Sequence, residues 1–280
     1  MSPNTLRSWE RRFGFPEPRR TAGGHRQFDL AEIEALRAAF EETHNISSAI
    51  SVARQRGSGP TSPARLRSAF SRYDEDGANR LLEESLTVRS VERTVEEVLL
   101  PAVEELGPEA GQGYGPEYGF AWRFATGWLA ASMRVAPPAS RGDGILVFDA
   151  SRPPSADALH AQAFELLLRR AGLRTLTLTA DIDPSRLVHA ITALEPRAVV
   201  LTGQGASLDA LGRLVYTARR VSGDEVVVVD YRGAIPHAGS STVERLADAP
   251  LAARDGLLER LDGRSSSRRF PRRDASAVGL

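Results

Sequence analysis

The residues best suited to chemistry stand near the start of the chain, where arginines recur at helical spacing. Arg7 and Arg11 are one helical turn apart, so both side chains can point the same way, and Arg12 follows them. Further arginines surround a Gly-Gly pair, and they are Arg19, Arg20 and Arg26. A guanidinium group donates paired hydrogen bonds that match both a phosphate and the edge of guanine. This cluster therefore has the chemistry to bind the phosphates and base edges of a nucleic acid.

Hydrophobic spacing predicts a helix that carries the first three of these arginines. Ser2 and Pro3 are residue types favoured at a helix start. The apolar residues recur every three or four positions, which places them on one inward face: Leu6, Trp9 and Phe13. Gly14 is expected to end the helix, because glycine readily adopts a left-handed conformation. The arginines fall largely outside the apolar stripe.

A basic turn and a short strand are expected after this helix. Residues 21–24 contain two glycines and predict a turn, and Arg26 and Phe28 flank Gln27 as on a strand. Residues 1–30 hold six arginines and three acidic residues, which leave a net charge of +3 with His25 neutral. A helix fits the major groove of DNA, and a basic turn beside it adds contacts to phosphates. A solvated basic face on a small helical domain is the alternative explanation.

The motifs of this region resemble the DNA-binding domain of the MerR family of transcription regulators. The resemblance rests on Thr5-Leu6-Arg7-x-Trp9-Glu10-Arg11-Arg12-Phe13-Gly14 and on Arg20-Thr21-x-Gly23-Gly24-His25-Arg26-x-Phe28, and it runs from about Ser2 to Arg54. It implies a winged helix-turn-helix that binds double-stranded promoter DNA as a homo-oligomer. The residues expected to contact DNA are Thr5, Arg7, Ser8, Arg11, Arg12, Arg19, Arg20, His25 and Arg26.

In that family a short strand and a first helix precede the recognition helix. Here Met1 stands at the threshold of the recognition helix. We expect either that the true start lies upstream or that the domain lacks one supporting helix. In the second case the apolar face of the helix loses part of its cover, and the domain should be less stable.

Composition is that of an ordinary soluble protein. The chain has 280 residues, which suits two domains, and it is 41% hydrophobic and 26% charged. It holds no run of about 18 apolar residues and no signal peptide, so we predict a cytoplasmic protein without a membrane partner. It also holds no cysteine, which excludes disulfides and thiolate chemistry.

Charge is distributed unevenly along the chain, although the formal net charge is zero. Residues 74–109 carry eleven acidic residues and three arginines, whereas residues 264–273 carry five arginines and no acidic residue. Because an acidic segment is repelled by DNA, the two basic ends are the expected contact zones. The basic tail is equally explained as a disordered terminus.

Patterning divides the chain into five segments. We predict a DNA-binding domain over 1–56 (truncated at its N-terminus), with a helix over Leu30–Arg54, and a Gly/Ser/Pro-rich linker over 57–63. Helical periodicity over 64–139 predicts a four-helix bundle. We predict an α/β domain over 140–262 and a basic, disordered tail over 263–280.

The α/β domain is predicted from unbroken apolar runs that alternate with helical segments. The strands are expected at 145–148, 176–178, 198–201 and 226–229, and the helices at 157–171, 184–194, 208–221 and 242–247. This alternation is typical of a flavodoxin-like or Rossmann-type parallel sheet covered by helices on both faces. Ligands bind at the carboxyl ends of such strands, which here include residues 149–151, 202–205 and 230–233.

The order of a MerR-type region, a helical bundle and this α/β domain resembles the CarH-like, cobalamin-binding, light-sensing repressors of the MerR family. The resemblance implies that adenosylcobalamin is held between bundle and sheet, with a histidine below the cobalt and a tryptophan covering the other face. This chain departs from that pattern. Glu117 matches a family glutamate, but Tyr118 replaces its neighbouring histidine and Gly107 stands at the tryptophan position. Asp157 falls at the lower histidine position and His160 at a glycine position.

These departures leave the cofactor unassigned, because carboxylate and phenol are weak replacements for imidazole on cobalt. The residues expected to line a ligand site are Tyr114, Glu117, Tyr118, Trp122, Asp157, His160, Thr202, Gly203, Gln204 and Gly205. We therefore predict a regulator whose sensory or oligomerisation domain has lost the usual cobalamin ligands and takes some small-molecule effector. The alternatives are a light sensor that binds adenosylcobalamin weakly or atypically, and a scaffold that acts through protein contacts.

A catalytic function is a further alternative. An acidic site near the strand ends could form from Glu117, Asp149, Asp157, His160 and Asp230. However, the sequence shows no Ser-His-Asp order, no phosphate-binding loop and no metal-ligand spacing. We therefore predict no catalytic residue and no metal site.

Overall fold

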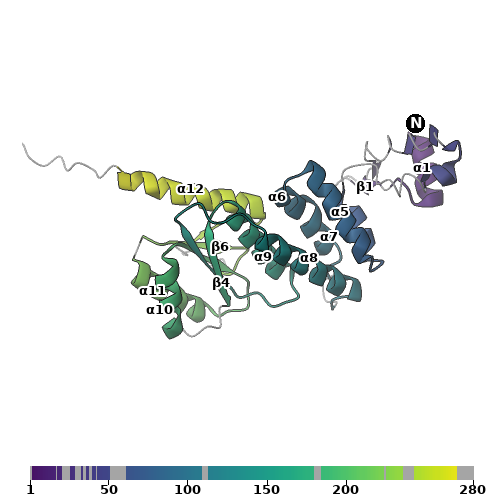
Figure 1. The fold of residues 1–280 in the computed structure, drawn as a ribbon. Helices are drawn as coiled ribbons and strands as arrows, with labels where there is room; N and C mark the ends of the chain where they lie inside the picture. Colours follow the sequence, from purple (N-terminus) through teal and green to yellow (C-terminus); the bar gives the residue numbers. More distant parts are fainter. Residues whose placement is uncertain are drawn as a thin grey trace, which may run out of the picture. The chain divides into compact units, whose positions relative to one another are not determined.

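In the computed structural model the chain forms two compact units, Met1–Val98 and Leu99–Leu280. Figure 1 shows the ribbon, coloured along the sequence. The structure describes residues 2–16, 18–20, 26–28, 33, 36–37, 40–41, 43–50, 61–108, 113–179, 184–223, 225–235 and 243–269.

The first unit opens with helix α1, Pro3–Phe13, whose ends are those that the sequence predicts. The Ser2 Oγ accepts a hydrogen bond from the backbone N–H of Thr5 at 3.2 Å and so caps the helix. Gly14 closes the helix at a φ of 64° and donates its N–H to the carbonyl of Glu10 at 2.8 Å. The helix is therefore fixed locally at both ends.

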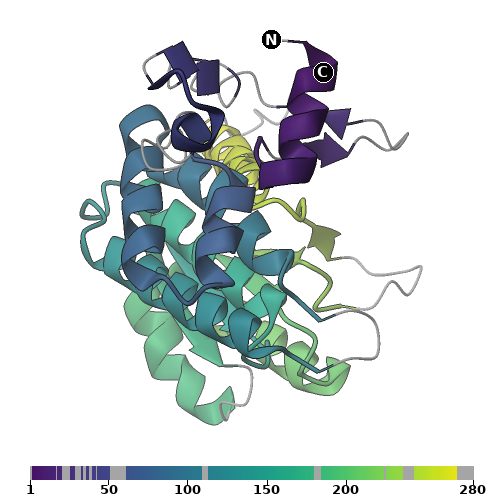
Figure 2. The same ribbon diagram turned by 90° about the vertical axis from the view of Figure 1, so that its right-hand side faces the viewer.

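Two short strands follow α1 and pair antiparallel. In β1, Arg19–Arg20, residue Arg19 lies opposite Gln27 and Arg20 lies opposite Arg26 of β2, Arg26–Gln27. Figure 2 shows the two strands side by side, next to α1. This is the backbone expected of a wing, although the predicted turn at 21–24 lies outside the described residues.

A small apolar core holds α1 in the first unit. Trp9 and Phe13 pack against the buried side chains of Leu36, Ala49 and Ile50. The predicted continuous helix over Leu30–Arg54 was wrong, because the helical residues are interrupted at His44, which has a φ of 48°. A new helical segment then starts at Asn45. Its Oδ1 accepts hydrogen bonds from the backbone N–H groups of Ser47 and Ser48 at 2.9 and 3.3 Å.

Further helices fill the two units up to residue 134. The first unit contains α4 (Pro63–Phe70), α5 (Glu75–Val88) and α6 (Val91–Thr94), and a π-helical turn over Val95–Leu99 crosses the boundary. The second unit opens with α7 (Leu100–Glu104) and α8 (Pro116–Arg134). The predicted four-helix bundle extends across both units and stays a prediction.

The second unit is built on a five-stranded parallel sheet, which confirms the predicted α/β class. Its strands are β3 (Gly144–Asp149), β4 (Arg174–Thr179), β5 (Pro196–Thr202), β6 (Val227–Tyr231) and β7 (Glu244–Arg245). They lie in the order β4-β3-β5-β6-β7, which is the flavodoxin-like order. The helices between and after the strands are α9 (Ala156–Arg170), α10 (Pro184–Leu194), α11 (Leu208–Ser222) and α12 (Pro250–Arg269).

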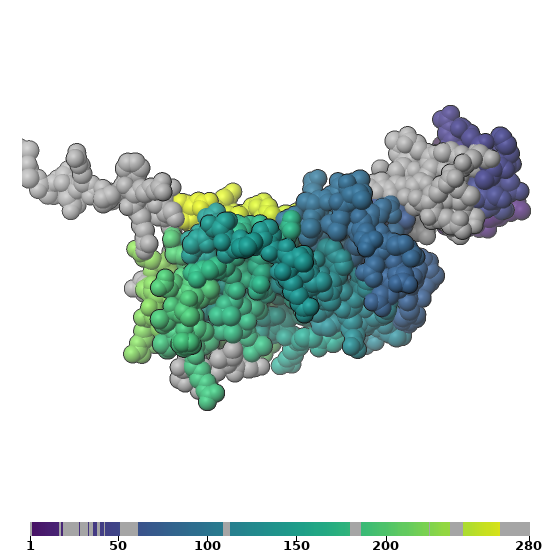
Figure 3. All heavy atoms as spheres, in the orientation of Figure 1, coloured from purple at the N-terminus to yellow at the C-terminus, as the bar shows by residue number. Residues whose placement is uncertain are grey.

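Strand residues alternate between two cores on the opposite faces of the sheet. Leu146 and Phe148 of β3 belong to the core that α10 and α11 cover. Ile145 and Val147 belong to the core that α9 and α12 cover. Figure 3 shows the green α10–α11 surface and the yellow α12 on different sides of this unit. Burial on both faces explains why the strands are continuous apolar runs.

The C-terminal part of this unit differs from the sequence prediction. The helix predicted over 242–247 was wrong, because Glu244–Arg245 pairs in parallel with Val229 and Asp230 as strand β7. The tail predicted from residue 263 is helical up to Arg269. The helix α12 was not predicted, and it docks on the sheet through Ala253, Leu257 and Leu261, one turn apart. Residues 270–280 lie outside the described residues.

Candidate functional site

Helix α1 presents a polar face to solvent on the side opposite its core face. Leu6 is buried, whereas Arg7, Ser8 and Arg11 are exposed and make no hydrogen bond or ion pair within the described part of the chain. Arg12 is also exposed, and its guanidinium carbon lies 5.2 Å from the centre of the Phe13 ring. Two unpaired cations on one helix face can donate to phosphates and to base edges.

The other residues expected to contact DNA are placed less completely. The Thr5 hydroxyl shares a hydrogen bond of 2.8 Å with the Ser2 hydroxyl, so it is engaged in the start of the helix. Strands β1 and β2 position the backbones of Arg19, Arg20 and Arg26 on a paired ribbon. His25 lies outside the described residues.

A second site is formed in the second unit, where the strand order changes direction. The chain leaves β3 toward β4 on one side and reaches β5 on the other, so the carboxyl ends of β3 and β5 flank a switch point. The loops after these strands touch closely: the N–H of Gly205 donates to the carbonyl of Ala150 at 2.8 Å. A Cβ on Gly203, whose φ is +80°, would lie 2.2 Å from the backbone nitrogen of Ser151. Glycine is therefore required there.

Two hydroxyl groups at this switch point have no hydrogen-bond partner among the described residues. They are the Oγ of Ser151 and the Oγ1 of Thr202, both buried, and Thr202 is fully buried. A buried hydroxyl without a partner costs about 1–3 kcal/mol. Gln204, between the two glycines, is exposed. The switch point therefore offers donors and acceptors that the described residues do not use.

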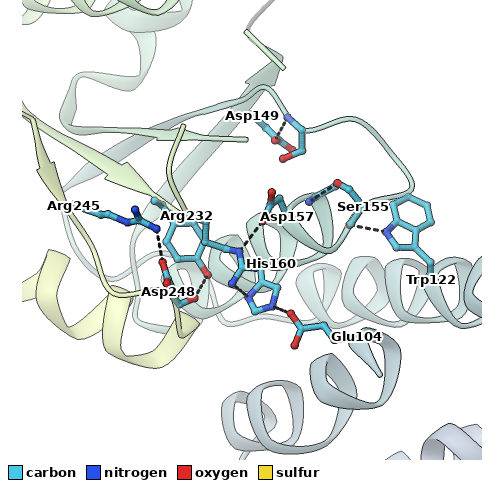
Figure 4. Close-up of polar contacts among 12 residues, drawn as sticks. Glu104, Trp122, Asp149, Ser155, Asp157, His160, Arg232, Arg245 and Asp248 are labelled. Atoms are coloured by element: carbon cyan, nitrogen blue, oxygen red, sulfur yellow. Dashed lines mark hydrogen bonds and ion pairs between the residues drawn. The ribbon is translucent and has the colours of Figure 1, made fainter. Parts of the chain in front are cut away.

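A polar network joins four side chains beside the switch point, at the first turns of α9 (Figure 4). The buried His160 contacts the Glu104 carboxylate through Nε2 at 2.6 Å. Its other ring nitrogen, Nδ1, lies 3.5 Å from the Arg232 Nη1, and the Arg232 Nε donates to Asp157 at 2.9 Å. The network thus connects α7, α9 and the segment after β6.

Hydrogen-bonding capacity assigns the protons in this network. Arg232 can only donate, so its 3.5 Å contact is a hydrogen bond only to a Nδ1 that carries no proton, and in that tautomer Nε2 donates to Glu104. The hydrogen bond from His160 is the main reason why the pKa of Glu104 lies below its usual value, against the opposing effect of burial. Both imidazole nitrogens are therefore engaged within the protein.

Aromatic side chains of α8 and the residues before it cover the same region. Tyr118 is buried and stacks on Tyr114, with ring centres 4.8 Å apart. Burial, together with the nearby Tyr114, Glu104 and Asp157, raises the pKa of Tyr118 to about 12, so its phenol stays neutral. The Trp122 Nε1 donates to the carbonyl of Ser155 at 3.1 Å and ties α8 to the start of α9 (Figure 4).

The structure thus brings many of the predicted ligand-site residues into two neighbouring groups. One group contains Tyr114, Tyr118, Asp157 and His160, and the other contains Thr202, Gly203 and Gly205. Glu117 is half-buried in the first turn of α8. Sequence reasoning missed Glu104, and it named Ser151 and Arg232 only as parts of strand ends. A spacing of 56 residues between Glu104 and His160 gives no local signal.

Two further results apply to the described residues. They contain no group of three or more His, Cys, Asp or Glu side chains that could hold a metal ion. None of their helices is long and apolar enough to span a membrane.

Comparison with known proteins gives one family match and several relatives. Residues 1–41 match the MerR HTH family regulatory protein model. The chain is 34% identical over 113 residues to the HTH-type transcriptional repressor CarA of Myxococcus xanthus, a match that covers 37% of this chain and only 39% of that protein. It is 26% identical over 220 residues to the HTH-type transcriptional repressor CarH of the same organism, covering 70% of this chain and 73% of CarH.

A solved structure is similar to this chain in fold. It is the monomethylamine corrinoid protein of Methanosarcina barkeri, with a TM-score of 0.50 and 13% sequence identity. The match covers 69% of this chain and 95% of that protein. The likeness concerns the fold alone.

Proposed function

We propose that this chain, a MerR-type transcription regulator with a C-terminal domain of the cobalamin-binding type, binds promoter DNA through α1 and the β1–β2 ribbon, and that its C-terminal domain no longer holds cobalamin through a histidine. It acts in the cytoplasm as a homo-oligomer, and a small-molecule effector or protein contacts control its assembly. It is not an enzyme, in line with its relatives, which are transcriptional repressors.

The exposed face of α1 carries the DNA-binding part of this proposal. Arg7 and Arg11 are exposed and unpaired within the described residues, on the side away from the buried Leu6. Neither cation has a structural partner among the residues that the structure describes, whereas phosphates and guanine edges would satisfy them.

Substitution of Arg11 tests this part. We expect Arg11→Ala to weaken binding to a promoter fragment by about 1–3 kcal/mol if Arg11 reads a base. The measurement is an electrophoretic shift at fixed salt concentration, since affinity for DNA depends on salt. Arg80→Ala is the matched control, because Arg80 is an exposed arginine of α5 without a partner in the described residues. Equal affinity of Arg11→Ala and wild type would remove Arg11 from the interface.

The polar network carries the second part of the proposal. Cobalt is best held by a neutral imidazole nitrogen, and His160 has both nitrogens engaged, by Glu104 and by Arg232. Asp157, at the position of the family's lower histidine, is paired with Arg232. The residues present therefore do not fit a histidine-ligated cobalamin.

Spectroscopy on the full chain tests this part. The protein is mixed with adenosylcobalamin in the dark and passed through gel filtration while the visible spectrum and the eluted mass are recorded. We expect a colourless protein of unchanged mass. A chromophore that co-elutes, with a change of mass that light reverses, would show that the sensor works despite its altered ligands.

The two unpartnered hydroxyls favour a second candidate function. The Ser151 Oγ and Thr202 Oγ1 are buried acceptors and donors at the switch point, where the glycines keep the two loops close. They would suit a ligand held by hydrogen bonds alone, including a cobalamin bound without a protein ligand to cobalt. In that case the gel-filtration experiment gives a coloured protein whose spectrum is that of cobalamin without histidine coordination.

A further inference from the structure

Asn4 lies on the exposed face of α1, and no contact with another described residue accounts for it. Successive residues of a helix are about 100° apart, so Asn4 lies within about 60° of Arg7, Ser8 and Arg11. On the same basis it is about 140–180° from the core residues Leu6, Trp9 and Phe13. The four polar residues Asn4, Arg7, Ser8 and Arg11 are all exposed and form one stripe.

The Asn4 side chain has no partner among the described residues. It makes no hydrogen bond to any described residue, and the helix start is already capped by Ser2, which accepts from the N–H of Thr5. Asparagine is also a poor helix former compared with alanine or glutamate. An exposed asparagine in a first helical turn with no capping task is better explained by a partner outside the chain.

The position of Asn4 decides what it could read. The N-terminal residues of a recognition helix are those that reach the base edges in the major groove. Asn4 belongs to the first turn of α1, with Arg7 one turn further. From Asn4 to Arg11 the stripe extends about 10 Å, at 1.5 Å per residue, which matches about three base pairs. An asparagine amide forms paired hydrogen bonds with the N6 and N7 atoms of adenine.

We propose that Asn4 is a specificity-determining residue that reads an adenine edge, at the N-terminal end of the stripe that Arg7 and Arg11 continue. This inference rests on the proposed DNA-binding function. It adds a base-reading amide to the arginines, and it assigns Thr5, whose hydroxyl is engaged with Ser2, to the helix start and not to base reading.

The test is selection of bound sequences from a randomised DNA duplex library with the full chain. Wild type, Asn4→Ala, Asn4→Gln and the control Asn79→Ala are compared, since Asn79 is an exposed asparagine of α5. We expect wild type and Asn79→Ala to enrich the same motif. Asn4→Ala should lose preference for adenine at one position by about 5- to 150-fold and keep the rest of the motif. Asn4→Gln, which keeps the amide, should retain part of that preference.

Three results would overturn the inference, and one of them would also refute the proposed DNA-binding function. If Asn4→Ala selects the same motif with unchanged base preferences, Asn4 does not read a base, while the proposed function stands. A uniform loss of affinity at every sequence would make Asn4 a backbone contact and would also refute the inference. If wild type enriches no motif at all, the inference fails together with the proposed sequence-specific function.

Discussion

Glu104 offers the sharpest test of the polar network, because one isosteric change removes its charge. In the wild-type protein the His160 Nε2 lies 2.6 Å from a Glu104 carboxylate oxygen. In Glu104→Gln the amide oxygen can still accept a hydrogen bond from that nitrogen. Only the charged character of the hydrogen bond is lost. The partners on the far side, Arg232 and Asp157, remain paired with each other.

The expected magnitude follows from the strength of this bond and from its exposure. A hydrogen bond to a charged group contributes about 1.5–3 kcal/mol, and a neutral bond about half of that. Because 39% of the Glu104 side chain is exposed, solvent screening reduces the difference, and we expect Glu104→Gln to lower the free energy of unfolding by about 0.5–1 kcal/mol. For a unit of this size that corresponds to a fall of about 1–4 °C in Tm.

The pH dependence of this effect has a definite sign. The hydrogen bond from His160 lowers the pKa of Glu104 in the folded protein below its ordinary value of 4.5. The stability that the carboxylate contributes is therefore fully present above pH 4.5 and is lost as the pH falls through the folded pKa. Since glutamine does not titrate, the difference between wild type and Glu104→Gln should shrink below pH 4.5 and vanish at lower pH.

Thermal unfolding followed by circular dichroism measures both effects. Glu259→Gln is the matched control, because Glu259 is an exposed glutamate of α12 without a partner among the described residues, and its Tm should equal that of wild type. The reasoning is refuted if Glu104→Gln and wild type have the same Tm at pH 7. It is also refuted if their difference persists undiminished at a pH where the wild-type carboxylate is protonated.

Two further predictions concern the switch point. Gly203→Ala should lower the free energy of unfolding by about 2 kcal/mol or more, because its Cβ would lie 2.2 Å from the Ser151 nitrogen at a φ of +80°. Urea titration measures this change. Gly212→Ala is the control, and it should be neutral or stabilising, because an added Cβ there has no heavy atom within 4 Å. Thr202→Val should keep or raise stability, because it removes a buried hydroxyl without a partner. A clear loss of stability would show that the hydroxyl has a hydrogen-bond partner in the folded protein.

Local patterns in the sequence were sufficient for most helices and strands. Helix α10 begins at Pro184 and ends at Leu194, as the periodicity predicts, because proline favours the first turn and the apolar residues recur at helical spacing. The ends of α1 were predictable for the same reason, since Ser2 and Gly14 act only on their neighbours. Strands β3, β5 and β6 were recognised because burial on both faces gives continuous apolar runs.

The errors lie where distant residues decide the structure. Strand β7 is two polar residues, and it exists only because Val229 and Asp230 of β6 offer a free edge. Its sequence carries no strand pattern. The break at His44 depends on a positive φ and on the capping by Asn45, which the apolar spacing of the surrounding residues conceals. Strand β7 depends on tertiary pairing, and the break at His44 depends on local side-chain hydrogen bonds. Hydrophobic periodicity indicates neither of these.

The candidate site was predictable only in part, for a related reason. The strand order places residues 149–151 and 202–205 together by topology, so the glycines and Thr202 could be named in advance. The polar network could not, because Glu104, His160 and Arg232 come from three elements far apart in the chain. A sequence motif identified Asp157 and His160 as positions that differ from the family. It did not indicate that Arg232 pairs with Asp157 or that Glu104 contacts His160.

His160 cannot both bind a metal ion and keep its contacts with Glu104 and Arg232. A metal ion could use a nitrogen of His160 only after the hydrogen bond to Glu104 or the contact with Arg232 is broken. Losing a hydrogen bond to a charged group costs about 1.5–3 kcal/mol, which would weaken metal binding by about 10- to 150-fold. The same contacts join α7 to α9 and to the segment after β6 without any ligand. These contacts therefore support the proposal that His160 does not serve as a cobalt ligand in this chain.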